Sequence, residues 1–162
     1  MPSQSRKGPI KRIVQRIRAL RPRTVEEARA AGFKMRKLGE GMYRRVYKVK
    51  NYDIVFKFPG ATAETKTGGR KHAAQEMSRL KRLRRCEALH RFLPEIYYYD
   101  KESGVIAMKY YPPFADFEEE ADAMGRMIGT LIQKLTRVRC NDIHTENVRQ
   151  NREDTVIIDL GF

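Results

Sequence analysis

Apolar residues recur at helical spacing near the start of the chain. Between residues 10 and 20 they fall on one side of a helix whose other side carries Arg and Lys: Ile10, Ile13, Val14, Ile17 and Leu20. A second short helix is predicted from Thr24, which can cap it together with Glu27, and Gly32 ends it. A basic amphipathic helix could bind a membrane, RNA or an acidic partner. We expect the first helix instead to pack its apolar side on the domain and to leave its charges in water.

Two later stretches also predict helices. Over residues 70–89, Leu80 and Leu83 follow Glu76 by four and seven positions, so this acid shares their inward face. From Asp116 onward, apolar residues again form one face: Ala121, Met124, Ile128, Leu131 and Leu135. The segment 59–69 is rich in Gly and Thr and is predicted to be a loop.

Strand patterns fill the intervals between the helices. Three strands are predicted over residues 33–58, and a hairpin over residues 93–113. A last β-branched run, 156–158, follows a polar turn and leads into Asp159. The mixture predicts one α+β domain with a modest core.

Composition narrows the classes of partner. The chain has 162 residues and a net charge of +14, and residues 1–37 alone carry twelve Lys and Arg against two Glu. The positive electrostatic field of such a chain favours phosphate-rich partners, but it does not identify which one. Two cysteines imply no disulfide framework, and no apolar run suits a membrane span or a secretory signal. We therefore expect a cytoplasmic protein.

Oxygen-bearing side chains gather near the end of the sequence. Asp142 is followed five positions later by Asn147, and Asp159 comes directly after the apolar run. Carboxylates and carboxamides are the hard ligands that suit Mg²⁺. A loop whose acids are merely solvated would have the same pattern, so the rest of the chain must decide.

A lysine inside an apolar strand is the second unusual feature. Lys57 stands in Ile54-Val-Phe-Lys-Phe58, where burial of its charge would require an anionic partner. Glu76 is a candidate partner, although it could also be an ordinary surface charge. Upstream, Gly39 and Gly41 precede Val46, and glycines let backbone N–H groups approach phosphates closely.

These features, in this order, resemble the protein-kinase-like superfamily over residues 33–162. They are the glycine loop, the strand lysine, the helix glutamate, Asp142-x-x-x-x-Asn147 and Asp159-Leu-Gly161. The resemblance implies an α+β kinase-like fold, with an antiparallel five-stranded N-lobe containing one helix and a much reduced helical C-lobe. It divides the chain into a basic helical extension (1–32), an N-lobe (33–111) and a C-lobe (112–162).

The resemblance also implies roles for individual residues. Gly39, Gly41 and Val46 would cover ATP, and Lys57 would contact its phosphates, held by Glu76. Met108, Tyr110 and Tyr111 would form the hinge beside adenine, although an aromatic sheet core explains the tyrosines equally well. Asn147 and Asp159 would bind Mg²⁺. Asp142 would accept the proton of the acceptor hydroxyl, and His144 would neutralise charge on the γ-phosphate.

Several departures from the family pattern stand out. Arg44 replaces the third glycine and could contact phosphate or hold the loop away from it. His144 replaces a lysine, as in aminoglycoside-phosphotransferase-like kinases, and Cys140-Asn141 replaces His-Arg. The sequence stops at Phe162, so the expected C-lobe is minimal, of the kind that small viral genomes carry.

We therefore expect an ATP- and Mg²⁺-dependent phosphotransferase of the Ser/Thr protein-kinase type, with a protein acceptor docked through the basic N-terminal half. One alternative is a pseudokinase that acts as a binding module for a protein or nucleic acid. The other is a nucleic-acid-binding protein driven by residues 1–37, whose affinity would fall steeply with salt.

Overall fold

The computed structural model describes most of the chain. The described residues are 7–113, 118–139, 143, 147–151 and 154–159. They form two compact units, one of Met1–Arg70 with Ile96–Tyr110, the other of Lys71–Glu95 with Tyr111–Phe162. No helix in the described residues is long and apolar enough to cross a membrane.

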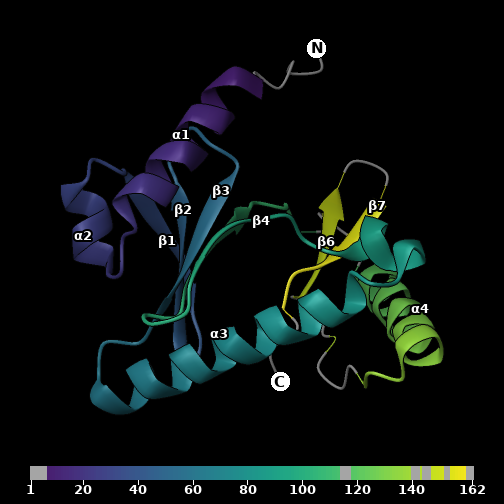
Figure 1. The fold of residues 1–162 in the computed structure, drawn as a ribbon. Helices are drawn as coiled ribbons and strands as arrows, with labels where there is room; N and C mark the ends of the chain where they lie inside the picture. Colours follow the sequence, from purple (N-terminus) through teal and green to yellow (C-terminus); the bar gives the residue numbers. More distant parts are fainter. Residues whose placement is uncertain (1–6, 114–117, 140–142, 144–146, 152–153, 160–162) are drawn as a thin grey trace. The chain divides into compact units, whose positions relative to one another are not determined.

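The first unit is built on a five-stranded antiparallel sheet (Figure 1). Its strands, in the spatial order β1-β2-β3-β5-β4, are β1 (Met35–Glu40), β2 (Arg44–Val49), β3 (Ile54–Pro59), β5 (Val105–Lys109) and β4 (Ile96–Asp100). One helix, α3 (Ala63–Leu83), lies between β3 and β4 in the sequence. The predicted α+β class and antiparallel five-stranded sheet are confirmed.

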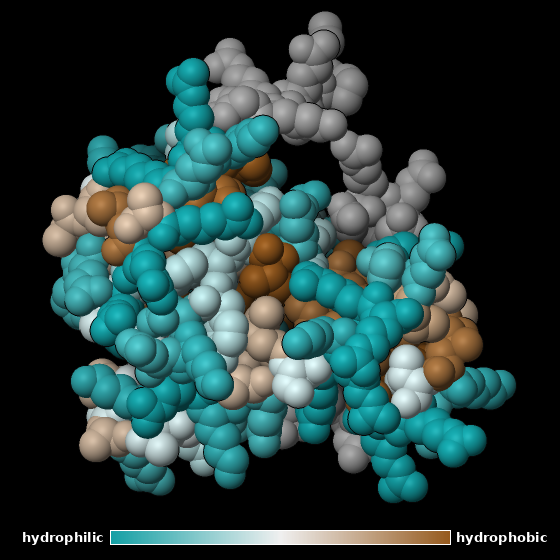
Figure 2. Space-filling model, in the orientation of Figure 1, coloured by the Kyte–Doolittle hydropathy of each residue, from teal (hydrophilic) through white to brown (hydrophobic). Residues whose placement is uncertain are grey.

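Helices α1 (Lys7–Leu20) and α2 (Val25–Ala30) cover one face of this sheet. Their buried side chains Val14, Ile17, Val25 and Ala28 share a core with Tyr47, Phe56, Phe58 and Ala107. Adjacent aromatic rings in this core pack closely, with the Phe56 and Phe58 centroids 5.3 Å apart. The expected packing of the first helix through its apolar side is therefore confirmed, and its basic residues contribute to the hydrophilic surface in Figure 2.

Hydrogen bonds and ion pairs tie the α1–α2 connection to the hairpin of β4 and β5. Arg18 Nε donates to the Tyr97 carbonyl (2.8 Å), and an Arg21 guanidinium nitrogen lies 3.2 Å from a carboxylate oxygen of Asp100. Arg23 lies 3.6 Å from Asp100 and 3.0 Å from Glu102. The basic N-terminal segment is thus an integral part of the first unit.

Local signals for α2 act as predicted. The Glu27 N–H donates to Thr24 Oγ1 (3.0 Å), and the Glu27 carboxylate accepts from the Arg23 N–H (2.8 Å). Gly32 follows the helix with φ of +94°, a conformation that other residues adopt only with strain.

The predicted loop over residues 59–69 is wrong, because α3 already begins at Ala63. Thr62 starts the helix by accepting from the Thr65 N–H (3.2 Å) through its hydroxyl. A Cβ added at Gly68 would lie 2.3 Å from the Tyr43 ring, and a Cβ added at Gly69 would lie 2.6 Å from the Tyr43 carbonyl oxygen. The glycines therefore permit close packing of a helix rather than marking a loop.

The second unit contains the rest of α3, a 3₁₀ helix η1 (Glu87–Phe92), α4 (Glu118–Thr136) and a hairpin of β6 (Val148–Asn151) and β7 (Asp154–Ile157). The predicted helix over 70–89 ends early, at Leu83, because the chain turns there and buries Leu89 through η1, which packs on β7.

The buried face of α4 differs slightly from the prediction. Ala121 and Ile128 are buried as expected, but the stripe continues through Ile132, and Leu135 is 47% exposed. Gly125 lies on the same stripe, where Ile143 and Val148 approach within 3.0 Å of an added Cβ. Because α4 packs closely at Gly125, its buried face passes through Gly125 and Ile132. The periodicity of apolar residues alone predicts a slightly different face, which includes Leu135.

Candidate active site

The sheet face opposite α1 and α2 carries several of the predicted site residues. Lys57 of β3 pairs with Val46 of β2 on one side and with Ile106 of β5 on the other. Directly paired residues project to the same face, whereas neighbours along a strand alternate. Lys57 and Val46 therefore face away from the core that Phe56 and Phe58 form with α1 and α2.

Two further apolar side chains share this face. Val55 pairs with Met108 across β3 and β5, and each lies two residues from a member of the Lys57–Ile106 pair. Val55 is 6% exposed and Met108 1% exposed. Sequence analysis identified Met108 but missed Val55, which the strand period of two beside Lys57 would have indicated.

Gly39 and Gly41 lie in the hairpin that joins β1 and β2. Gly39 pairs with Val46, and the Gly41 N–H donates to the Arg44 carbonyl (2.8 Å). Neither glycine has a positive φ, and an added Cβ would meet nothing within 4 Å at Gly39 and only the Arg44 carbonyl, at 3.9 Å, at Gly41. The fold of the first unit therefore does not itself require glycine here, and leaves open space above the backbone.

Arg44, which replaces the third glycine, begins β2. It is 9% exposed and lies two residues before Val46, so it projects to the same face as Lys57. The face that carries the candidate lysine therefore also carries a buried guanidinium.

Lys57 and Glu76 are both buried charged residues, 5% and 1% exposed. Glu76 shares the inward side of α3 with Ala73, Leu80 and Leu83, so the predicted orientation of Glu76 is confirmed. The two residues belong to different units of the chain. Their pairing stays a prediction.

Tyr110 and Tyr111, for which the resemblance predicts a hinge role, continue from β5. The Tyr110 N–H donates to the Asp53 carbonyl (2.9 Å), which extends the β3–β5 ladder by one pair. The Tyr111 hydroxyl accepts from the Glu95 N–H (3.0 Å). Burial raises the pKa of Tyr111 above its ordinary value, so its side chain is a neutral structural anchor.

Asn147 and Asp159 lie at the same end of the β6–β7 hairpin. Val148 pairs with Ile157, and the next pair outward is joined by a hydrogen bond from the Ile158 N–H to the Asn147 carbonyl (2.9 Å). Asp159 is therefore one residue beyond the partner of Asn147, and both side chains are half-buried. One carboxylate and one carboxamide at the same end of a hairpin fit a Mg²⁺ site.

Other predicted residues cannot be placed. Asp142 and His144 lie outside the described residues, as does the Leu160-Gly161 part of the metal motif. Within the described part of the chain, no three His, Cys, Asp or Glu residues form a cluster that could hold a metal ion. A Mg²⁺ site here would depend on Asp159, on Asn147 and on oxygen atoms from the nucleotide and from water.

Comparisons with known proteins give a structural likeness alone. No protein-family model matches the chain, and no curated protein matches it by sequence. Among solved structures, the streptomycin–ATP–APH(2")-IIa ternary complex matches with 18% sequence identity and a TM-score of 0.42. That match covers 67% of this chain and 36% of the other, so this chain spans about a third of that structure's length.

Proposed function

We propose that the chain is an ATP- and Mg²⁺-dependent phosphotransferase that moves the γ-phosphate of ATP to a hydroxyl group. The observation that carries this proposal is the buried amine of Lys57 on an apolar sheet face, in register with Val46 and Gly39. Apolar side chains on that face suit a base, and a cation beside them suits phosphates.

Each predicted residue has a role in this proposal. Lys57 holds the α and β phosphates, and Glu76 fixes the lysine amine. The glycine hairpin lets backbone N–H groups approach the phosphates. Asn147 and Asp159 hold Mg²⁺, which when bound neutralises charge on the phosphates.

The transfer itself would use Asp142. Its carboxylate orients the acceptor hydroxyl and takes its proton as the new bond to phosphorus forms and the bond to the β-phosphate oxygen breaks. His144 balances negative charge on the γ-phosphate. The acceptor we propose is a protein Ser or Thr side chain, docked through the basic N-terminal half.

The buried Arg44 supports a second candidate function. A guanidinium on the Lys57 face could occupy the position of a nucleotide phosphate, and the chain would then be a pseudokinase that binds a partner without transferring phosphate. In this alternative the chain has the same fold but does not catalyse phosphate transfer.

Labelled γ-phosphate transfer from Mg-ATP separates the two functions. The protein is assayed alone and with a cell lysate, beside an Asp142→Asn variant. Label that depends on Asp142 supports the phosphotransferase, and the labelled band identifies the acceptor. Absence of label from a protein that still binds ATP supports the pseudokinase.

A further inference from the structure

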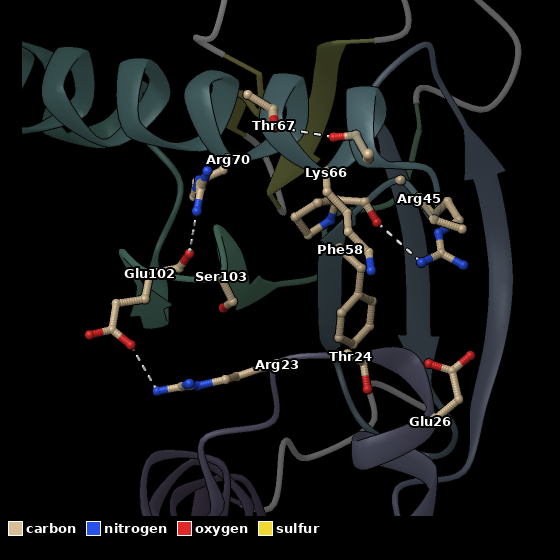
Figure 3. Close-up of a pocket in the computed structure, with 14 residues that line it drawn as sticks. Arg23, Thr24, Glu26, Arg45, Phe58, Lys66, Thr67, Arg70, Glu102 and Ser103 are labelled. Atoms are coloured by element: carbon tan, nitrogen blue, oxygen red, sulfur yellow. Dashed lines mark hydrogen bonds and ion pairs between the residues drawn. The ribbon is translucent and has the colours of Figure 1, made fainter.

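A cavity of 690 Å³ lies within the first unit, where β3 leads into α3 (Figure 3). Its walls come from the start of α2, from β2 and β3, from the first turns of α3 and from the turn between β4 and β5. Arg45 and Phe58, which line it, are cross-strand partners next in sequence to Arg44 and Lys57. The cavity is therefore on the opposite sheet face from Lys57 and is distinct from the proposed nucleotide site.

Basic side chains outnumber acidic ones around this cavity. Four cations line it, Arg23, Arg45, Lys66 and Arg70, against the carboxylates of Glu26 and Glu102. The Glu102 carboxylate is already paired with Arg23 at 3.0 Å. A surplus of positive charge remains among the other lining residues.

The remaining cations have no direct ion pair among the residues that the structure describes. Arg45 donates to the Pro59 carbonyl (3.1 Å) and Arg70 to the Glu102 carbonyl (3.4 Å), and neither contact neutralises a charge. Glu40 lies opposite Arg45 in the β1–β2 ladder, and Glu26 lines the cavity, so the two carboxylates offset part of the positive charge. Three cations from β2 and α3, none in a direct ion pair, thus line one cavity (Figure 3).

Arg45 has an unsatisfied donor beside the cavity. Among the described residues, its Nε–H is buried and has no hydrogen-bond partner. Buried donors in folded proteins nearly always have an acceptor, and an anionic oxygen is the strongest acceptor for a guanidinium. Arg45 also presents a planar fork that suits phosphate oxygens.

We propose that this cavity binds a small phosphate-bearing molecule. Its phosphate group is held by Arg45, Lys66 and Arg70, and its organic part lies along Pro59, Ala61 and Ala63. The volume suits a ligand of metabolite size. This site is additional to the proposed phosphotransferase activity and does not depend on it.

Inorganic pyrophosphate, without Mg²⁺, is the probe for this site. Calorimetric titration of the full chain is expected to show saturable binding, weakened at least tenfold in the Lys66→Gln/Arg70→Gln double variant. Both residues are exposed, so the variant should fold, as thermal unfolding without ligand will verify.

A matched double variant tests the location. Lys71→Gln/Lys81→Gln removes the same number of charges from exposed positions of the same helix outside the cavity. It is expected to keep the wild-type affinity within twofold. No saturable binding, an unchanged affinity in Lys66→Gln/Arg70→Gln, or an equal loss in Lys71→Gln/Lys81→Gln would each overturn the proposal.

Discussion

Lys57 lies directly opposite Val46 in the ladder of β2 and β3, so the two side chains share a sheet face. Val55 and Met108 make the same face apolar, while α1 and α2 cover the other. A buried amine in such surroundings is costly unless an anion is near. This is the face at which we propose that nucleotide phosphates bind.

Gly39→Ala should weaken the binding of Mg-ATP without changing the stability of the fold. An added Cβ meets no atom within 4 Å, so the free energy of unfolding should change by less than about 0.5 kcal/mol. If phosphates approach this backbone, the methyl group should weaken Mg-ATP binding. Urea denaturation and nucleotide titration measure the two effects, and an unchanged ATP affinity would argue against a phosphate-covering hairpin.

Gly69→Ala, in contrast, should lower the free energy of unfolding. Its Cβ would lie 2.6 Å from the Tyr43 carbonyl and 2.8 Å from the Pro59 Cα, both backbone atoms that cannot move easily. We expect a loss of about 1–3 kcal/mol from overpacking, which exceeds the gain in helix propensity of up to ~1 kcal/mol. Urea denaturation beside Gly39→Ala tests this, and a stabilised Gly69→Ala protein would show that the contact is not so tight.

Asp100 should make the stability depend on pH. Burial alone would raise the pKa of this carboxyl, but hydrogen bonds from the Ser103 hydroxyl and N–H and from Arg21, with the charge of Arg23, hold it below its ordinary value. The ionised carboxylate therefore stabilises the fold above about pH 4, and this contribution is lost as the pH falls through the folded pKa.

Asp100→Asn should accordingly lower the free energy of unfolding by about 1–3 kcal/mol at pH 7 and flatten its fall in acid. Glu102→Gln is the matched control, since its side chain is 75% exposed and its ion pair should contribute under ~1 kcal/mol. Chemical denaturation between pH 7 and pH 3 distinguishes them. Equal acid dependence in the wild type and Asp100→Asn would contradict this account.

Asn147→Ala should raise the Mg²⁺ concentration needed for nucleotide binding by about tenfold or more, because the proposed site loses a carboxamide ligand. Gln150→Ala, which removes an exposed carboxamide from the same hairpin, should have no effect. Titration of Mg²⁺ at fixed ATP measures both. Identical curves for the two variants would remove Asn147 from the metal site.

Short-range signals predicted much of the fold. The cap at Thr24, the inward position of Glu76 and the presence of strands on either side of Lys57 in the sequence all follow from spacing and residue type. Each depends on contacts within a helix turn or on strand alternation, which the sequence displays directly.

Long-range packing was not predictable in the same way. Composition predicts a loop at Gly68 and Gly69, whereas in the structure these glycines make room in α3 for Tyr43, which lies 25 positions earlier than Gly68 in the sequence. Likewise, the cavity beside Arg45 gathers residues from four separate segments, none of which forms a motif. The pairing of Lys57 with Glu76 and the roles of Asp142 and His144 remain predictions.

The most direct test of the central claim is the rate of γ-phosphate transfer from Mg-ATP by the wild type and Lys57→Met. We expect kcat/KM to fall by about 10²–10³-fold, because a cation aimed at the phosphates is lost. Lys71→Met, which removes an exposed lysine, should retain the wild-type rate. Equal rates in all three proteins, or no transfer by the wild type, would contradict the account.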